Sequence, residues 1–158
     1  MLVMNGAVLP APLLSTRSQG LGILSLPSPE GEPVRTVPLL AAAGGTVLPG
    51  LSVEAARVGL GDGTIVASAF PQTLRIGNLR IPLLSDALMR IHFASLENRK
   101  ARTIPADALM DGQIDPSRLS GKWVFLGASA PEAGGLRLTA IDPFLPSVQF
   151  MPKLSTSS

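Results

Sequence analysis

The stretch Leu119-Ser-Gly-Lys-Trp-Val-Phe-Leu-Gly-Ala-Ser-Ala130 decides how this sequence is interpreted. Residues 123–126 are four consecutive large apolar side chains, and a β-strand turns successive side chains to opposite faces. Such a strand has no polar face to expose, which is typical of a central, parallel strand covered on both sides. The stretch therefore predicts a buried strand over Lys122–Leu126, followed by a turn of small residues.

The residues before this stretch predict a crossover unit. A strand is expected over Leu88–Phe93. A short helix is expected over 105–111, with Pro105 in its first turn and Asp107 near the positive end of the helix dipole. Strand, helix and buried strand in this order form a βαβ crossover.

Further upstream, the pattern predicts short strands over 1–9, 21–26 and 34–40, and one helix over Leu51–Leu60. A hairpin is expected over 74–81, with Arg75 and Arg80 on its solvent face. The predicted fold class is α/β, a mixed sheet with a βαβ crossover and hairpins.

Composition excludes several kinds of site. The 158 residues contain no Cys and one His, which excludes disulfides, zinc–thiolate sites, iron–sulfur clusters and multi-histidine metal sites. No cofactor is expected. The net charge is only +2, and the densest basic cluster (Arg99, Lys100 and Arg102) is expected in one polar loop. Because a basic stripe and stacking aromatics are both missing, we expect no nucleic-acid partner.

No segment of the sequence predicts a membrane span or a secretory signal. The longest uncharged run, Thr36–Val53, is interrupted by prolines and glycines, whereas a spanning helix needs about 20 mostly apolar residues. The first sixteen residues lack the basic region of a signal peptide. On this evidence alone, the chain is expected to stay in the cytoplasm.

Two residues suggest a serine hydrolase as one alternative function. Ser129 follows the predicted buried strand in a turn that resembles half of a nucleophile elbow, but Pro131 replaces the second glycine of that motif. The single histidine, His92, precedes the serine, opposite to the order in α/β-hydrolases. A small-residue turn and a structural histidine explain both residues without catalysis, so no catalytic residue is assigned.

Six blocks of the sequence, in order, resemble one family of sensor domains: the cyclase/histidine-kinase-associated sensory extracellular (CHASE) domain of type two. The resemblance covers residues 22–146. The blocks are 30–40 (EGEPVRTVPLL), 48–57 (LPGLSVEAAR), 76–83 (IGNLRIPL), 88–94 (LMRIHFA), 119–130 (LSGKWVFLGASA) and 136–139 (LRLT). Each block alone is a weak signal, and their joint order and spacing make the match specific.

The resemblance implies a mixed α/β sensory domain on the extracytoplasmic, periplasmic face of a bacterial membrane. Such domains regulate an adenylate or guanylate cyclase, a histidine kinase or a Ser/Thr kinase, through membrane helices that are absent from this chain. The family supplies no ligand-binding residues. From the sequence itself, the candidates are Arg35, Ser129 and Arg137. The signal, a small molecule or a protein, stays unknown, and dimerisation is left open.

The departures from the family predict a truncated module without a catalytic domain. Residues 1–20 are interpreted as an N-terminal remnant and connector, 21–150 as a partial sensor domain, and 151–158 as a disordered tail. Because the strands of the family's first half are missing, we expect exposed apolar surface. The alternative to a receptor fragment is a stand-alone small α/β ligand-binding domain.

Overall fold

The computed structural model describes residues 1–149 except 30, 62, 131 and 133–134. Of residue 150 it describes the backbone alone. The predicted disordered tail over 151–158 lies outside the described residues, as does Pro131 of the serine turn. Helices and strands are mixed over several small sheets, so the α/β class is confirmed.

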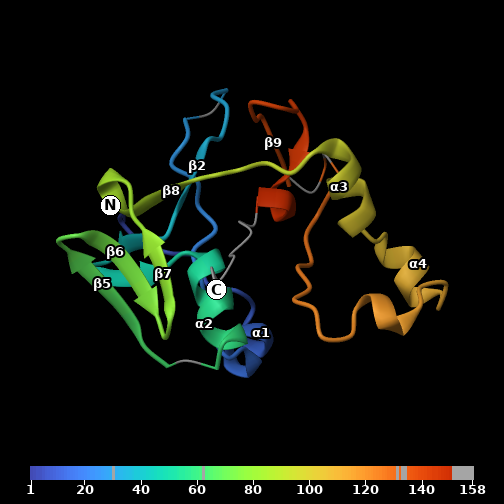
Figure 1. Cartoon of the computed structure of the whole chain (residues 1–158), viewed down its shortest axis with the longest axis horizontal. Coiled ribbons are helices and arrows are strands. Elements are labelled where there is room, and N and C mark those ends of the chain that lie inside the picture. Colours follow the sequence, from blue (N-terminus) through green and yellow to red (C-terminus); the bar gives the residue numbers. More distant parts are fainter. Residues whose placement is uncertain (30, 62, 131, 133–134, 151–158) are drawn as a thin grey trace.

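The first half of the chain holds two three-stranded sheets and two helices (Figure 1). The first sheet has β3 (Leu40–Ala43) between β1 (Leu2–Met4), which is parallel to it, and β4 (Thr46–Pro49), which is antiparallel. The second is an antiparallel meander of β5 (Ile65–Ala69), β6 (Gln72–Ile76) and β7 (Leu79–Pro82). The helices are α1 (Pro12–Arg17) and α2 (Leu51–Gly59).

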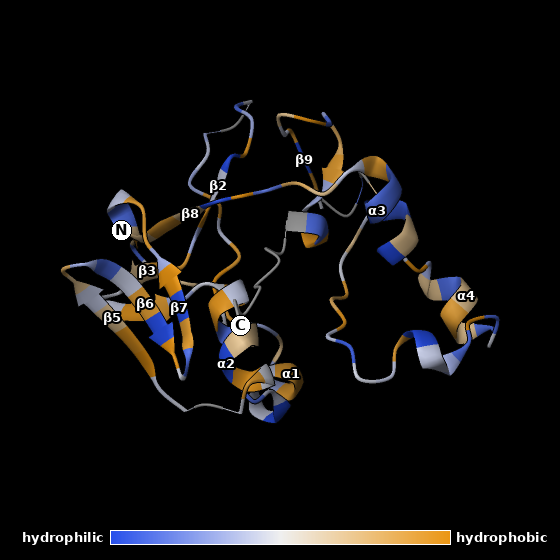
Figure 2. Cartoon of the chain, viewed as in Figure 1, coloured by the Kyte–Doolittle hydropathy of each residue, from blue (hydrophilic) through white to orange (hydrophobic). Residues whose placement is uncertain are grey.

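The main core forms where α2 meets these strands, and Figure 2 shows the hydrophobic colouring of that region. The helix contributes Val53 and Ala56, which are almost fully buried. The other buried members of this cluster are Leu39, Leu74, Ile76, Leu79 and Ile81. The predicted helix over 51–60 and the predicted hairpin are confirmed. In each of them the spacing of the apolar residues matches the period of the element, so these residues lie on one face.

The two arginines of the hairpin lie on its solvent face, as the alternation of apolar and basic residues predicts. Arg75 on β6 and Arg80 on β7 are direct cross-strand partners, and both are exposed. Their neighbours Leu74 and Ile81, which are also paired, point to the core. Side chains along a strand alternate between the two faces, so one register determines both results.

A second, smaller core joins the middle of the chain to its end. Val34, Val37, Ile91 and Leu145 form it. Two strand pairs surround it: β2 (Thr36–Pro38) with β8 (Leu88–Arg90), and β9 (Leu136–Arg137) with β10 (Leu145–Pro146), both antiparallel. A 3-10 turn, η1 (Ser85–Ala87), precedes β8.

Two upstream strand predictions need correction. The strand expected over 34–40 is divided between β2 and β3, which belong to different sheets. The break is at Leu39, whose N–H donates to the Ala87 carbonyl at 2.9 Å rather than to a strand of either sheet. The strand expected over 21–26 is reduced to a single bridge between Ile23 and Gly50.

The basic cluster lies on a helix rather than in the expected loop. This helix, α3 (Leu96–Arg102), begins after Ser95, whose hydroxyl accepts from the Asn98 N–H at 3.3 Å. Serine at this position satisfies one of the free N–H groups of the first turn. A second helix, α4 (Ala106–Met110), confirms the prediction over 105–111, and the 3-10 turns η2 (Pro116–Arg118) and η4 (Ser147–Phe150) follow. Neither α3 nor α4 buries a residue.

The prediction of a buried strand over Lys122–Leu126 is wrong. This segment belongs to no strand, all its residues are exposed, and Leu126 is 91% exposed. The βαβ crossover is absent with it, since β8 pairs with β2 in the antiparallel sense. The physical reason is that a strand is stabilised by a paired neighbour, and no described strand lies beside this segment.

The expected exposed apolar surface is confirmed by large apolar side chains that lie open to solvent, among them Val8 (100%), Phe70 (95%) and Leu126 (91%). The chain has an accessible surface of 10827 Å², whereas compact monomers of its 16.4 kDa mass have about 7,500 Å². Full exposure of the residues outside the description would add at most roughly 2,000 Å². More than about 1,000 Å² of excess surface therefore belongs to the described residues.

Candidate functional site

Of the three residues predicted from the sequence, Ser129 and Arg137 belong to the C-terminal part of the chain. Arg35 comes from the N-terminal part. Arg35 is exposed and directly precedes β2, and its carbonyl accepts from the Ile91 N–H at 2.9 Å. Arg137 is exposed on β9, and its Nη1 donates to the Leu136 carbonyl at 2.8 Å. Ser129 is exposed in the segment after Leu126.

Backbone contacts bring these three residues into one region of the fold. The Val34 N–H donates to the Leu138 carbonyl at 2.9 Å, and Val34 forms a parallel bridge with Thr139. In this register Arg35 and Arg137 are about three residues apart along the strands, roughly 10 Å. On the other side, the backbone of Gly135 lies against the Ala128 carbonyl, close to Ser129. The three residues therefore remain a prediction as a ligand site.

The hydrolase alternative gains nothing from the geometry. His92 lies just beyond β8 and is exposed, and Ser129 is exposed as well. Neither side chain makes a hydrogen bond to any described residue. A serine nucleophile needs a base within about 3 Å, held in turn by a third group, and the described part of the chain contains no such arrangement.

A partly buried ion pair on α2 joins Glu54 to Arg57. Glu54 is 7% exposed, and its two carboxylate oxygens accept from Nε and Nη2 of Arg57 at 2.9 and 2.6 Å. The same Nη2 donates to the carbonyl of Gln19 at 3.0 Å. Gly20 lies so close to the Glu54 carboxylate that a Cβ atom there would overlap it. The pair thus fastens the connector before residue 21 to the helix.

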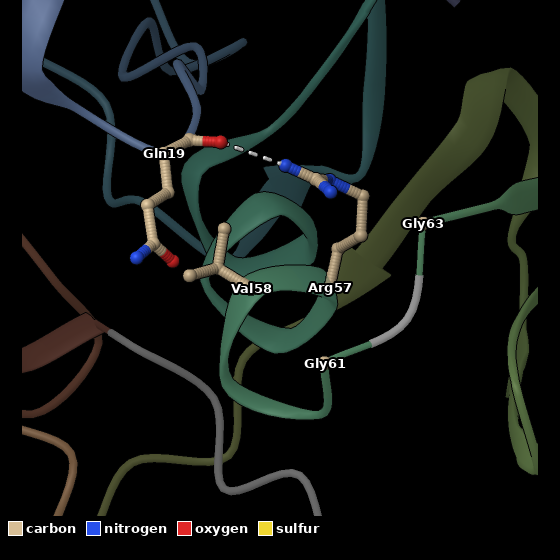
Figure 3. Close-up of a pocket in the computed structure, with 5 residues that line it drawn as sticks. All are labelled: Gln19, Arg57, Val58, Gly61 and Gly63. Carbon is tan, nitrogen blue, oxygen red and sulfur yellow. Dashed lines mark hydrogen bonds between the residues drawn. The ribbon is translucent and has the colours of Figure 1, made fainter.

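The Arg57 side chain also lines a pocket at the end of α2, shown in Figure 3. Its other lining residues are Gln19, Val58, Gly61 and Gly63, and its volume is about 220 Å³. Ligand pockets for drug-sized molecules span about 300–1,000 Å³. A pocket of this volume suits a small ligand, and its lining includes two polar side chains, those of Arg57 and Gln19.

Hydrogen bonds shift the pKa of two charged groups, Arg57 and Asp115. The hydrogen bond from Arg57 to Glu54 raises the pKa of the Arg57 guanidinium. On η2, the Ser117 N–H donates to Asp115 at 2.9 Å and lowers the pKa of that carboxyl. The cap on η2 is therefore fully formed above the ordinary Asp value of 3.8 and weakens as the pH falls below it.

The sequence indicates only part of this pocket. The spacing of Glu54 and Arg57 predicts an i, i+3 pair on one face of the helix, and that pair forms. Gln19 lies 38 positions away from Arg57 and carries no motif, so only the packing of the connector reveals it. In the sequence, the glycines at 61 and 63 indicate the end of the helix. In the structure they also line the pocket.

Two searches for other kinds of site were negative within the described ranges. No group of three or more His, Cys, Asp or Glu side chains could hold a metal ion. Of the helices described, none has the length and apolar character needed to cross a bilayer.

Comparison with known proteins gives one match. The family model of the CHASE2 domain matches residues 3–155, nearly the whole chain. This match extends beyond both ends of the segment 22–146 that carries the blocks quoted above. No curated protein and no solved structure matches the chain.

Proposed function

Because the chain belongs to the CHASE2 domain family, we propose that it is the signal-input domain of a membrane-bound receptor and performs no catalysis itself. CHASE2 domains are extracellular sensory domains generally associated with cyclases and kinases. The family match over residues 3–155 is the observation that carries the proposal. Its second part follows from the same match, because the family is one of sensory domains.

The proposal also includes a location: the domain lies outside the cytoplasmic membrane of a bacterium. There it would regulate an adenylate or guanylate cyclase, a histidine kinase or a Ser/Thr kinase. The physical requirement for such a role is a ligand that binds one conformation better than another. Membrane helices elsewhere in the receptor then carry that bias to the output domain.

The pocket beside Arg57 is our candidate for the ligand contact. A guanidinium group donates charge-assisted hydrogen bonds to carboxylates and carbonyl oxygens, and the Nη1 group of Arg57 is not used by the bonds to Glu54 and Gln19. Since Glu54 already neutralises the Arg57 charge, the pocket favours a small polar ligand over a multiply charged anion. The Gln19 amide, on the exposed connector, supplies the adaptable polar group that can be changed without disturbing the core.

A thermal-unfolding screen against small polar metabolites tests this proposal. A ligand at 100 times its Kd adds about 2.7 kcal/mol to the free energy of unfolding, which corresponds to a rise in Tm of roughly 5–10 °C for a domain of this size. With Gln19→Ala, we expect the same compound to produce less than half of that rise, because one polar contact is lost.

Gln113→Ala is the matched control, since Gln113 is an exposed glutamine outside the pocket. This variant should keep the full rise in Tm. A rise that is equal in both variants would place the ligand elsewhere in the domain. A complete screen without any rise would argue against small-molecule sensing by this chain.

A further inference from the structure

The hairpin of β6 and β7 places two positive charges directly opposite each other. Arg75 and Arg80 are cross-strand partners, and the next pair, Ile76 and Leu79, encloses the turn. Residues at such positions have Cβ atoms about 4.5–5.5 Å apart, and like charges there are destabilising. Both arginines are exposed on the solvent face of the meander. An anion between the two guanidinium groups would remove this repulsion.

Counter-charges for this arginine pair are absent from the described residues around it. The sequence has no Asp or Glu over residues 63–85, which include all three strands of the meander. Across the other strand boundary, the partner of Arg75 on β5 is the apolar Val66. The acid that follows the meander, Asp86, binds the N-terminal ammonium group at 2.8 Å. Neither arginine forms an ion pair with any described residue.

One of the two guanidinium groups is already held within the hairpin. Nη1 of Arg75 donates to the Gly77 carbonyl at 3.2 Å, and this bond uses one of the five N–H donors of the group. Its other donors, and all those of Arg80, make no hydrogen bond to a described residue. Because a side chain positioned in advance loses less freedom on binding, the pair offers charged donors at a reduced entropic cost.

We propose that Arg75 and Arg80 together bind a phosphate group, which lies between their guanidinium groups. The planar fork of an arginine matches the oxygens of phosphate, and each arginine can donate two parallel N–H bonds to them. A phosphate monoester has a charge of about −1.5 to −2 at pH 7, close to the opposite of the charge on two arginines. A carboxylate has a single charge and two oxygens, so one arginine already satisfies it.

This phosphate site differs in charge from the pocket beside Arg57. In that pocket Glu54 neutralises the arginine, whereas the pair on the hairpin has no such partner among the described residues. The two sites have no residue in common. The inference therefore does not depend on the sensory role or on the ligand proposed above.

Titration with inorganic phosphate, followed by the arginine Nε–H signals of a nitrogen-15-labelled sample, tests the site. Sodium chloride keeps the ionic strength constant, since salt screens exposed charges. We expect the signals of Arg75 and Arg80 to shift and to saturate. Arg80→Gln should weaken binding roughly tenfold or more, because the charge-assisted bonds of one guanidinium group are lost. Arg80→Lys keeps the charge without the fork, so its affinity should lie between the two.

Sedimentation with vesicles of phosphatidylcholine and phosphatidic acid distinguishes two sources of the phosphate group. Vesicle binding that Arg80→Gln abolishes would support a lipid headgroup as the source. A chain that binds inorganic phosphate and yet stays in the supernatant would support a soluble phosphate compound.

Arg90→Gln is the matched control for the phosphate titration. Arg90 is an exposed arginine on β8, and its cross-strand partner is Thr36 rather than a second arginine. This variant should keep the affinity of the unaltered chain. Equal weakening by Arg80→Gln and Arg90→Gln would reveal only a general attraction of anions to positive charge, and it would overturn the proposal. Signals of Arg75 and Arg80 that do not shift, or that shift without saturating, would overturn it as well.

Discussion

Replacing Leu74 by alanine should lower the free energy of unfolding by about 2–5 kcal/mol. Leu74 is fully buried in β6, between β5 and β7, and belongs to the main core that α2 covers. Its truncation removes apolar contacts and leaves a cavity that the paired strands on both sides prevent from collapsing. Because domains are stable by only about 5–15 kcal/mol, urea unfolding followed by circular dichroism should show a large shift of the midpoint.

Leu24→Ala is the control for this experiment. Leu24 is 70% exposed and belongs to no helix or strand. This variant should unfold within about 0.5 kcal/mol of the unaltered chain. If Leu74→Ala behaved like Leu24→Ala, the main core would not be packed as described.

Replacing Gly50 by alanine should have an effect of similar size, about 3 kcal/mol, for a different reason. Gly50 precedes α2, and its N–H donates to the Leu39 carbonyl at 2.8 Å. A Cβ atom there would overlap the carbonyl oxygen of Pro38. That oxygen belongs to the backbone, so it cannot move aside as a flexible side chain can. The β4–α2 connection must open instead, which exposes the core between α2 and β3.

The control for the Gly50 variant is Gly63→Ala. Nothing lies within 4 Å of the position that a Cβ atom would take at Gly63, and its φ is not in the left-handed region. Alanine there should leave the stability unchanged or raise it by up to about 1 kcal/mol, through reduced freedom of the unfolded chain. A thermal-melting comparison of the two variants measures the difference, and equal Tm values would contradict the close approach at Gly50.

The elements that the sequence predicts correctly carry their information locally. The helix over 51–60 and the hairpin around Arg75 and Arg80 each have apolar residues at the period of their own element. The helix α3 also has a local signal, Ser95 followed by a first-turn Glu97. The charge cluster at Arg99, Lys100 and Arg102 alone suggests a solvated loop, and this is why the loop prediction differs from the structure.

The prediction of a buried strand over 122–126 failed because it depended on partners rather than on a local pattern. Residues 123–126 have the composition of a central strand, but a strand exists only when another strand accepts its hydrogen bonds. The same holds for the candidate site. Glu54 and Arg57 are visible as a helical pair, whereas Gln19 joins them only through folding of the connector. The pattern of apolar residues therefore indicates which secondary structure a segment favours. Whether the segment finds the partners that this structure needs is visible only in the fold.

The most direct test of the central claim, that this chain is the input domain of a membrane receptor, is to sequence the DNA on both sides of its coding region. We expect membrane-helix segments and a cyclase or kinase domain to be encoded next to it, in the same or an adjacent reading frame. Unrelated genes on both sides would contradict the proposed role.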